Sequence, residues 1–391
     1  AAPEDCGQSL PQGSGEAKTQ PLANGGISLL STQQNVSYID PTKQTCDSAT
    51  EVTESDTTWG DDNNDGWYVV NSNVTISTRV TVTGDVHLIL KDGFTLNATK
   101  GINVTGTNSL TIYAQSENEN TMGKLDATAP NDEGANAAIG GSQNETAGTI
   151  TINGGKITAK NEASPDPWLP NIHGAAIGGG GSGGSGTITI NGGIVNATTA
   201  RNGDGAGIGS GENAASGSIT ITGGVVYAAS NGAGAGIGGG YCGSDYKGNQ
   251  NISITISGGT VTAFAGYQSA AIGAGRNDNK SNVYQGTFST GENGNAVIFT
   301  GCRSSEENDL KNVLASISKF DSNSASGVIF IFKESDASTT GSHAGKVYGS
   351  VTPTEDFTIP AGYTLTIDNG TTLTIPEGVT LTNNGTINVD V

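Results

Sequence analysis

The chain has 391 residues, of which 61 are glycine, 5% are aromatic and 14% are charged, so it lacks the material for a large aromatic core. Its 17 basic and 37 acidic residues give a formal net charge of −20, which argues against nucleic acids and anionic lipids as partners. No apolar run approaches the ~20 residues that span a bilayer, so membrane insertion is not expected.

Residues 1–55 lack periodicity and are rich in Ser, Gln, Thr and Gly, which predicts an irregular leader or an N-terminal cap. The opening AAPEDCGQSL is compatible with a mature chain that follows a signal cleavage site. Cys6 with Cys46 and Cys242 with Cys302 are the disulfide pairs that would suit an exported protein. The cysteines have no C-x-x-C spacing, which disfavours zinc or redox chemistry.

The sequence DDNNDG at residues 61–66 places Asp61, Asn63 and Asp65 at the alternate positions that begin a calcium-binding loop. The twelfth position of such a loop would be Ser72, where a bidentate Glu is required, and GWYVV continues into a strand rather than a helix. An ordinary polar turn is therefore the prediction, with calcium as the alternative. No cofactor and no other metal site are expected.

Residues 56–130 contain short segments of alternating hydrophobicity, such as NVTIS, RVTVTG, VHLIL and SLTIYA. This period of two is typical of β-strands with one buried face. We interpret this region as the N-terminal coils of a repeat structure.

Residues 131–302 repeat three elements in a fixed order. The first, Ala-Ala/Gly-Ile-Gly, recurs at intervals of 38, 31, 29 and 35 residues; its isoleucines are Ile139, Ile177, Ile208, Ile237 and Ile272. The second, Thr/Ser-Ile-Thr-Ile-x-Gly-Gly, follows the first four of these isoleucines and ends at Gly155, Gly193, Gly224 and Gly259. A third strand comes at once, as in KITAK and VVYAA. One repeat is thus three short strands separated by glycine corners.

The isoleucines of the second element alternate with hydroxyl side chains, so one face of each strand is apolar. A unit of about 30 residues cannot bury that face alone, but stacked units can. The predicted fold is all-β: a single-stranded parallel β-helix with three short strands per coil, right-handed because parallel crossovers almost always are.

Residues 303–391 begin with a segment, 303–326, that breaks the pattern and is expected to be an excursion with a short helix or a lateral loop. The words TIPAGYTLTI and TIPEGVTLTN then recur at a spacing of 16 residues, which predicts C-terminal coils that continue the same solenoid.

The sequence GAGIGG at residues 234–239 fits the glycine pattern of a dinucleotide-binding loop. That loop requires a strand before it, a helix after it and an acidic residue about 20 positions on. None of this context is present, and the element recurs in every unit. The glycines are therefore expected to serve tight corners and close stacking of backbones.

Insertions into individual coils are the best candidates for a binding site, because solenoids carry function on lengthened loops. Two of them, 241–251 and 276–286, fall in adjacent coils and should lie side by side. A third, 161–173, is stiffened by three prolines. Tyr, Trp and Arg dominate recognition surfaces and aromatic rings stack on sugars, against the alternative of ordinary solvated loops. The predicted ligand-binding patch comprises Tyr241, Tyr246, Lys247, Arg276, Asn277, Asp278, Tyr284 and Trp168.

No catalytic residue is assigned. Paired carboxylates catalyse glycoside hydrolysis, but in so acidic a chain such pairs arise by accident. The candidates considered are Asp132, Glu145, Asp166, Asp204 and Glu212. The outward threonines of the second element form a flat hydroxyl face that could order water, which keeps an ice-binding face among the alternatives.

The segments GWYVVNSNVTIS, GAAIGGG with GTITINGG, and GKVYGSVTPTEDFTIPAGYTLTI make residues 55–391 resemble repeat-rich extracellular β-helix proteins of gut Firmicutes, which are adhesin-like. The resemblance implies a secreted or cell-surface protein and carries no catalytic residue. The expected function is non-catalytic binding of a host or dietary glycan, mucin or a host protein such as an immunoglobulin. A carbohydrate-active enzyme on the same scaffold and a passive surface spacer are the alternatives.

Overall fold

The structure is a computed structural model that describes residues 19–21, 27–29, 31–61, 66–130, 134–162, 174–244, 251–266, 269–276, 278, 286–290, 294–302, 344–353, 356–359 and 361–390. The side chains of a few of these, including Cys302, are not described. Within these ranges every regular element is a β-strand. The segment 303–326, where a helix or excursion was expected, lies outside the described residues.

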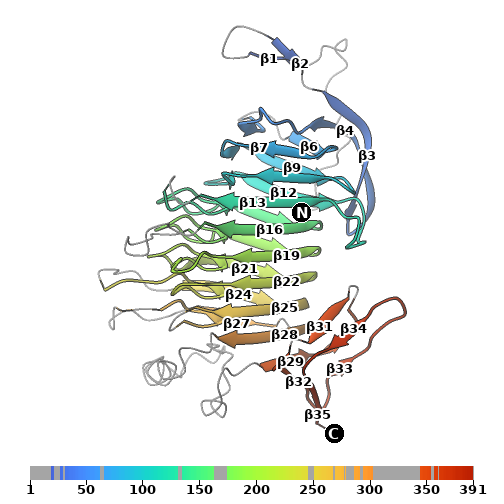
Figure 1. Cartoon of the computed structure of the whole chain (residues 1–391), viewed down its shortest axis with the longest axis vertical. Helices are drawn as coiled ribbons and strands as arrows, with labels where there is room; N and C mark the ends of the chain where they lie inside the picture. Colours follow the sequence, from blue (N-terminus) through green and yellow to red (C-terminus); the bar gives the residue numbers. More distant parts are fainter. Residues whose placement is uncertain are drawn as a thin grey trace.

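The strands stack into three long sheets that run the length of a rod (Figure 1). Each coil contributes one strand to each sheet, in the order A, B, C. Sheet A contains β5 (Thr58–Trp59), β8 (Val80–Val82), β11 (Ile102–Asn103), β14 (Ile139–Gly140), β17 (Ile177–Gly178), β20 (Ile208–Gly209), β23 (Ile237–Gly238) and β26 (Ile272–Gly273).

Sheet B carries the Thr-Ile-Thr-Ile strands and sheet C the strands that follow them. Sheet B contains β6 (Gly66–Val70), β9 (Asp85–Leu90), β12 (Ser109–Ala114), β15 (Thr149–Ile152), β18 (Thr187–Ile190), β21 (Ser216–Ile221), β24 (Asn251–Ile256) and β27 (Thr287–Ser289). Sheet C contains β7 (Val74–Ile76), β10 (Thr95–Ala98), β13 (Lys124–Ala129), β16 (Lys156–Asn161), β19 (Ile194–Thr198), β22 (Val225–Ala229), β25 (Gly258–Ala265) and β28 (Asn295–Cys302). The chain is therefore an all-β parallel β-helix, as predicted.

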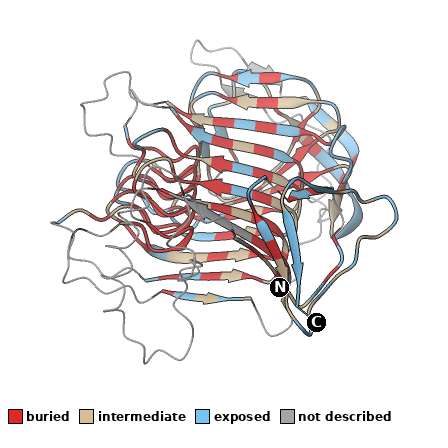
Figure 2. Cartoon of the chain, turned by 60° about the horizontal axis from the view of Figure 1, so that its bottom comes forward, coloured by how far each residue is buried: buried red, intermediate tan, exposed pale blue. Residues whose placement is uncertain are grey.

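Isoleucines of successive coils lie directly on one another. In sheet A, Ile177 pairs with Ile208 and Ile208 with Ile237, and in sheet B Ile188 pairs with Ile219. All five are fully buried. Along strands of sheet B such as β18 and β21, buried isoleucines alternate with hydroxyl side chains that are exposed or half-buried (Figure 2). The inward set predicted from the period of two is confirmed.

The Ala-Ile-Gly element is a strand and a corner, which confirms the structural interpretation of GAGIGG. Gly209 has a φ of 145°, and a Cβ added to it would lie 1.9 Å from the carbonyl oxygen of Gly238 in the next coil. The backbone amides are also in use: Ile237 N donates to Ala271 O at 2.8 Å and Gly239 N to Gly273 O at 2.9 Å. These amides bind the neighbouring coil, so they cannot hold a phosphate.

The N-terminal described residues form β1 (Thr19–Pro21) and β2 (Ile27–Leu29), then the antiparallel hairpin of β3 (Thr32–Asp40) and β4 (Thr42–Glu51). β4 pairs with β6 at the end of sheet B, and the hairpin reaches back along the rod beside β9 and β12 (Figure 1). Cys46 is disulfide-bonded. Its predicted partner, Cys6, lies outside the described residues.

Cys242 was predicted to pair with Cys302. It is instead a buried thiol, and its Sγ donates to the carbonyl oxygen of Gly240 at 3.7 Å. The structure therefore does not support the Cys242–Cys302 disulfide. The hydrogen-bond partner of this thiol is the carbonyl group of Gly240, two residues earlier in the chain.

The C-terminal strands do not continue the main stack in the same direction. They are β29 (Ala344–Tyr348), β30 (Ser350–Val351), β31 (Phe357–Ile359), β32 (Thr364–Ile367), β33 (Thr372–Leu373), β34 (Leu381–Asn383) and β35 (Thr386–Val389). β29 runs antiparallel to β28, whereas β29, β32 and β35 are mutually parallel. The expectation of one unbroken parallel solenoid is wrong at this junction.

The spacing of 16 residues also misleads in this region. Phe357 of β31 pairs with Leu381 of β34, and Thr364 of β32 pairs with Thr386 of β35. The two similar sequences therefore lie on different sides of the coil, and one coil is longer than the 16-residue spacing. Both sequences predict a strand, a turn and a second strand, because both contain Pro-x-Gly, which favours a turn.

Candidate functional site

A long open trough follows the corner between sheets B and C. It has a volume of about 770 Å³. Its floor consists of four stacked turns, one from each coil, in which a polar residue precedes two glycines. These turns are Asn153–Gly154–Gly155, Asn191–Gly192–Gly193, Thr222–Gly223–Gly224 and Ser257–Gly258–Gly259. We call this feature the corner trough.

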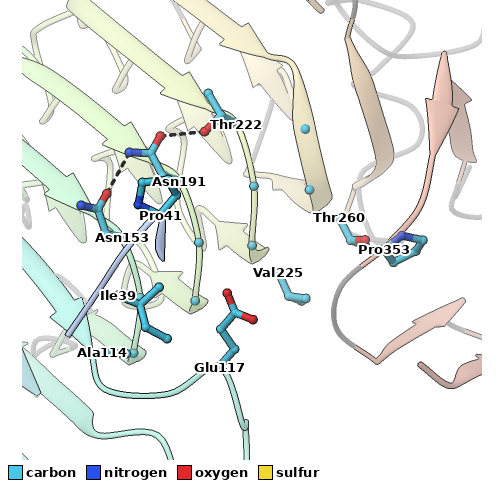
Figure 3. Close-up of a pocket in the computed structure, with 18 of the residues that line it drawn as sticks. Ile39, Pro41, Ala114, Glu117, Asn153, Asn191, Thr222, Val225, Thr260 and Pro353 are labelled. Atoms are coloured by element: carbon cyan, nitrogen blue, oxygen red, sulfur yellow. Dashed lines mark hydrogen bonds between the residues drawn. The ribbon is translucent and has the colours of Figure 1, made fainter. Parts of the chain in front are cut away.

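The polar residues of the corner trough form a hydrogen-bonded ladder (Figure 3). Asn191 Nδ2 donates to Asn153 Oδ1 at 2.8 Å, and Thr222 Oγ1 donates to Asn191 Oδ1 at 2.6 Å. Each amide retains a second N–H and a further lone pair. The ladder therefore fixes the amide orientations while leaving polar groups to face the trough.

The glycines of these turns let the coils approach closely. A Cβ on Gly223 would lie 2.3 Å from Asn191 O, and one on Gly258 would lie 1.9 Å from Thr222 O. Because real Cβ atoms do not come so near to a carbonyl, larger residues would push the coils apart. The Gly-Gly pairs therefore allow the turns of neighbouring coils to stack this closely.

Three segments distant from one another in sequence close the ends of the corner trough. At one end lie the tip of the β3–β4 hairpin, with Ile39, Asp40 and Pro41, and the loop that carries Glu117. Figure 3 shows the Glu117 carboxylate directed into the trough between Ile39 and Val225. At the other end lie Ser350 to Pro353. The trough is therefore closed at both ends.

Aromatic packing holds the hairpin in this position. Tyr38 of β3 lies 4.9 Å from Trp67 and 4.8 Å from Tyr113 between ring centroids, and Trp67 stacks on His87 at 4.3 Å. His87 Nδ1 lies 3.1 Å from the Tyr113 hydroxyl, and only 12% of its side chain is exposed. His87 points outward from sheet B, but the hairpin covers it.

The charged groups that line the corner trough, among the residues that the structure describes, are Asp40 and Glu117. Burial raises the pKa of Asp40, and the nearby His87 opposes that rise. The described lining contains no Lys, Arg or aromatic side chain. The trough is therefore suited to hydrogen bonding and offers no cationic group to an anion.

The predicted loop patch lies at the corner between sheets A and B, away from the trough along each coil. There the described parts of the two loops lie side by side: Cys242 N donates to Arg276 O at 2.8 Å, and Asp278 N donates to Cys242 O at 2.9 Å. Tyr241 donates its hydroxyl to Asp278 Oδ2 at 2.8 Å. Arg276 Nε donates to Asp278 Oδ1 at 2.8 Å and also lies over the Tyr241 ring, 5.5 Å from its centroid.

The pKa values of two side chains are shifted at this loop corner. Burial raises the pKa of Asp204 to about 6, although its bond from Ala233 N and the positive charge of Arg276 oppose the rise. Burial, the hydrogen bond to Asp278 and its charge raise the pKa of Tyr241 to about 12. Tyr241, Arg276 and Asp278 thus bind chiefly to one another, which uses much of their capacity for a ligand.

The remaining predicted site residues lie outside the described residues: Tyr246, Lys247, Asn277, Tyr284, Trp168, Asn63 and Asp65. In the sequence, Trp168 falls between β16 and β17, whereas Tyr241 follows β23 and Arg276 follows β26. Asp61 is described and exposed, but the calcium alternative stays a prediction because its two companions are not described.

Sequence reasoning missed the corner trough. A signal was present, since Asn, Asn, Thr and Ser recur at the same position before Gly-Gly. The end walls gave no signal, because no repeat links the hairpin or residues 350–353 to this corner.

The stacked coils with their repeated Ile and Gly columns define a repeat-rich parallel β-helix. A family model described as a beta helix repeat matches residues 150–181, 188–212, 219–241 and 254–276. No curated protein and no solved structure matches the chain. Within the described ranges, no helix has the length and apolar character needed to cross a membrane.

Proposed function

We propose that the protein is a non-catalytic extracellular binding module of adhesin type, secreted by or displayed on a gut bacterium. Its partner is a host or dietary glycan, including the glycans of mucin, with a host protein such as an immunoglobulin as the competing partner. A β-helix repeat is compatible with this function and with an enzyme, so the proposal depends on the surface features of the rod.

The observation that carries the proposal is the corner trough. It is long, open and polar, and consecutive coils present side-chain amides and hydroxyls in one line. Hydroxyl-rich chains pair with such groups, and a fixed array reduces the ordering entropy lost on binding. A protein that displays a polymer-binding trough along a stiff rod is suited to attachment.

A glycan array and a parallel screen against serum and secretory immunoglobulins test this function. The wild type should bind glycans on the array. Thr222 is exposed on the trough floor, so Thr222→Trp fills the trough and should abolish binding. Thr187→Trp, on the exposed outer face of β18 and outside the trough, is the matched control and should bind normally. Absence of glycan binding by the wild type, or equal binding by both variants, would contradict the proposal.

A carbohydrate-active enzyme is the second candidate, and one observation favours it. Asp40 and Glu117 bring two carboxylates to the same end of the corner trough. A pair of carboxylates is the machinery of most glycoside hydrolases. The test is release of reducing sugar from the bound polysaccharide: release that disappears in Asp40→Asn and in Glu117→Gln would establish the enzyme, and no release by the wild type would exclude it for that substrate.

A further inference from the structure

We propose that the corner trough takes a linear, uncharged polysaccharide strand that lies along the rod axis with about one sugar in contact with each coil. This inference rests on the proposed function, because it specifies the ligand class and binding mode of the same trough. If this inference about the binding mode fails, the proposed glycan binding still stands. The experiment below distinguishes failure of the inference from failure of the proposed function.

The repeat distance of the coils matches that of a sugar chain. Six successive coils, from the one with Ala114 to the one with Asn295, contribute residues to the trough, four of them through their Gly-Gly turns. Parallel strands stack ~4.8 Å apart, so five steps between the coils give a length of roughly 24 Å. A pyranose with its glycosidic bond advances by a distance close to one strand spacing. A sugar chain parallel to the axis therefore meets an equivalent polar group at each step.

The floor of the trough offers hydrogen-bonding groups. Asn153, Asn191, Thr222 and Ser257 present amide or hydroxyl groups, and the ladder orients the first three. Among the described lining residues there is no aromatic side chain, so recognition relies on hydrogen bonds rather than on ring stacking. Hydrogen bonds from evenly spaced donors and acceptors select an evenly spaced, linear array of hydroxyl groups.

The charge of the trough disfavours anionic ligands. Asp40 and Glu117 are the charged groups of the described lining, and the whole chain has a formal net charge of −20. Uronic-acid, sulfated or sialylated polymers would meet repulsion at the trough and across the surface, most strongly at low salt. Uncharged polymers do not meet it. The trough therefore discriminates against anionic glycans.

Titration calorimetry with oligosaccharides of increasing length tests this mode. The probes are cello-, manno- and chito-oligosaccharides from disaccharide to octasaccharide, with oligogalacturonates of the same lengths as the anionic comparison. For at least one uncharged series, affinity should rise with each added sugar until about five or six units and then level off, as expected from the stacking distance of ~4.8 Å. Oligogalacturonates should bind at least tenfold more weakly.

Variants connect the binding to the trough. Asn191→Ala removes the central rung of the ladder and should weaken binding of the hexasaccharide about tenfold, which is about 1.4 kcal/mol. Thr187→Ala is the matched control and should leave the affinity unchanged. Circular dichroism verifies that both variants are folded.

Three results would overturn the inference: affinity that does not depend on length, tighter binding of oligogalacturonates, or full affinity in Asn191→Ala. The inference would also fail if no uncharged series bound while a charged or branched glycan bound on the array, in which case the proposed function stands. An array with no bound glycan at all would overturn the proposed function itself.

Discussion

The central coils and the C-terminal coils are built from similar words but differ in how tightly they stack. In the central coils the inward isoleucines, such as Ile208 and Ile219, are fully buried between neighbours above and below. In β35, Ile387 is 38% exposed and Val389 is 57% exposed. Ile359 of β31 and Leu365 of β32 are fully buried, so a core continues into the C-terminal coils, and the open edge lies at β35, the outermost strand of its sheet.

Glycine differs between the two regions in the same way. In the central coils a Cβ on Gly178 or Gly209 would lie 1.9 Å from the carbonyl oxygen of the next coil. In the C-terminal coils a Cβ on Gly362, Gly370 or Gly378 would meet nothing within 4 Å. Gly178 and Gly209 are required by close stacking as well as by positive φ, whereas Gly362, Gly370 and Gly378 are required by positive φ alone. The difference shows that a glycine count alone does not measure how tightly coils are packed.

The largest expected effect is that of a methyl group at a central corner. Gly209→Ala combines a φ of 145° with a clash against Gly238 O, and should reduce the free energy of unfolding by about 4 kcal/mol or prevent folding. Gly370→Ala, with a φ of 86° and open space, should lose only about 1 kcal/mol. Urea denaturation measures both. Equal losses would show that the two regions stack alike.

Truncation of the core isoleucines should show the same contrast at a smaller scale. Ile219→Ala leaves a cavity in a fully buried column and should lose about 3 kcal/mol. Ile387→Ala removes a side chain that is 38% exposed and should lose less than about 1 kcal/mol. Thermal unfolding of the two variants compares them. A larger loss for Ile387→Ala would mean that the C-terminal coils hold the rod together.

The loop corner of the central coils should respond to pH. Asp204 has a pKa of about 6 in the folded protein, above its ordinary value near 4, so the folded state binds more protons between these values. Stability from this group is therefore present below about pH 4 and is lost as the pH rises through about 6. After allowance for solvent screening, the loss should be about 1 kcal/mol.

Asp204→Asn keeps an oxygen that can accept from Ala233 N but does not titrate. Its free energy of unfolding, measured by urea titration between pH 4 and pH 7, should lack the fall seen in the wild type. An unchanged pH dependence in the variant would show that other groups are responsible.

The smallest expected effect on stability belongs to the corner trough. Asn191→Ala removes two hydrogen bonds at an exposed rung and should lower the free energy of unfolding by less than about 1 kcal/mol. The same substitution should weaken ligand binding much more. A loss of several kcal/mol in urea denaturation would mean that the ladder is structural rather than a recognition surface.

The fold of the central coils could be predicted because one rule decides it. Alternating Ile and Thr leave one inward face, and the recurrence of Ile177, Ile208 and Ile237 leaves one register that stacks like on like. The C-terminal junction could not be predicted in this way. The reversal between β28 and β29 depends on a connection that shares no repeat with the coils on either side.

One part of the candidate site could likewise be predicted from the sequence, and another part could not. Adjacency of Tyr241 and Arg276 followed from the repeat interval, since equivalent loops of adjacent coils must be neighbours. The corner trough needed two facts that the repeat does not contain. One is the packing of Tyr38 on Trp67, which places Asp40 at one end, and the other is the position of Pro353 at the far end.

The most direct test of the central claim is the affinity of the wild type and of Thr222→Trp for the uncharged oligosaccharide series, measured by titration calorimetry beside Thr187→Trp. The account predicts affinity that rises with chain length in the wild type and in Thr187→Trp and is lost in Thr222→Trp. Length-dependent binding that survives in Thr222→Trp would place the ligand elsewhere on the rod and contradict the account.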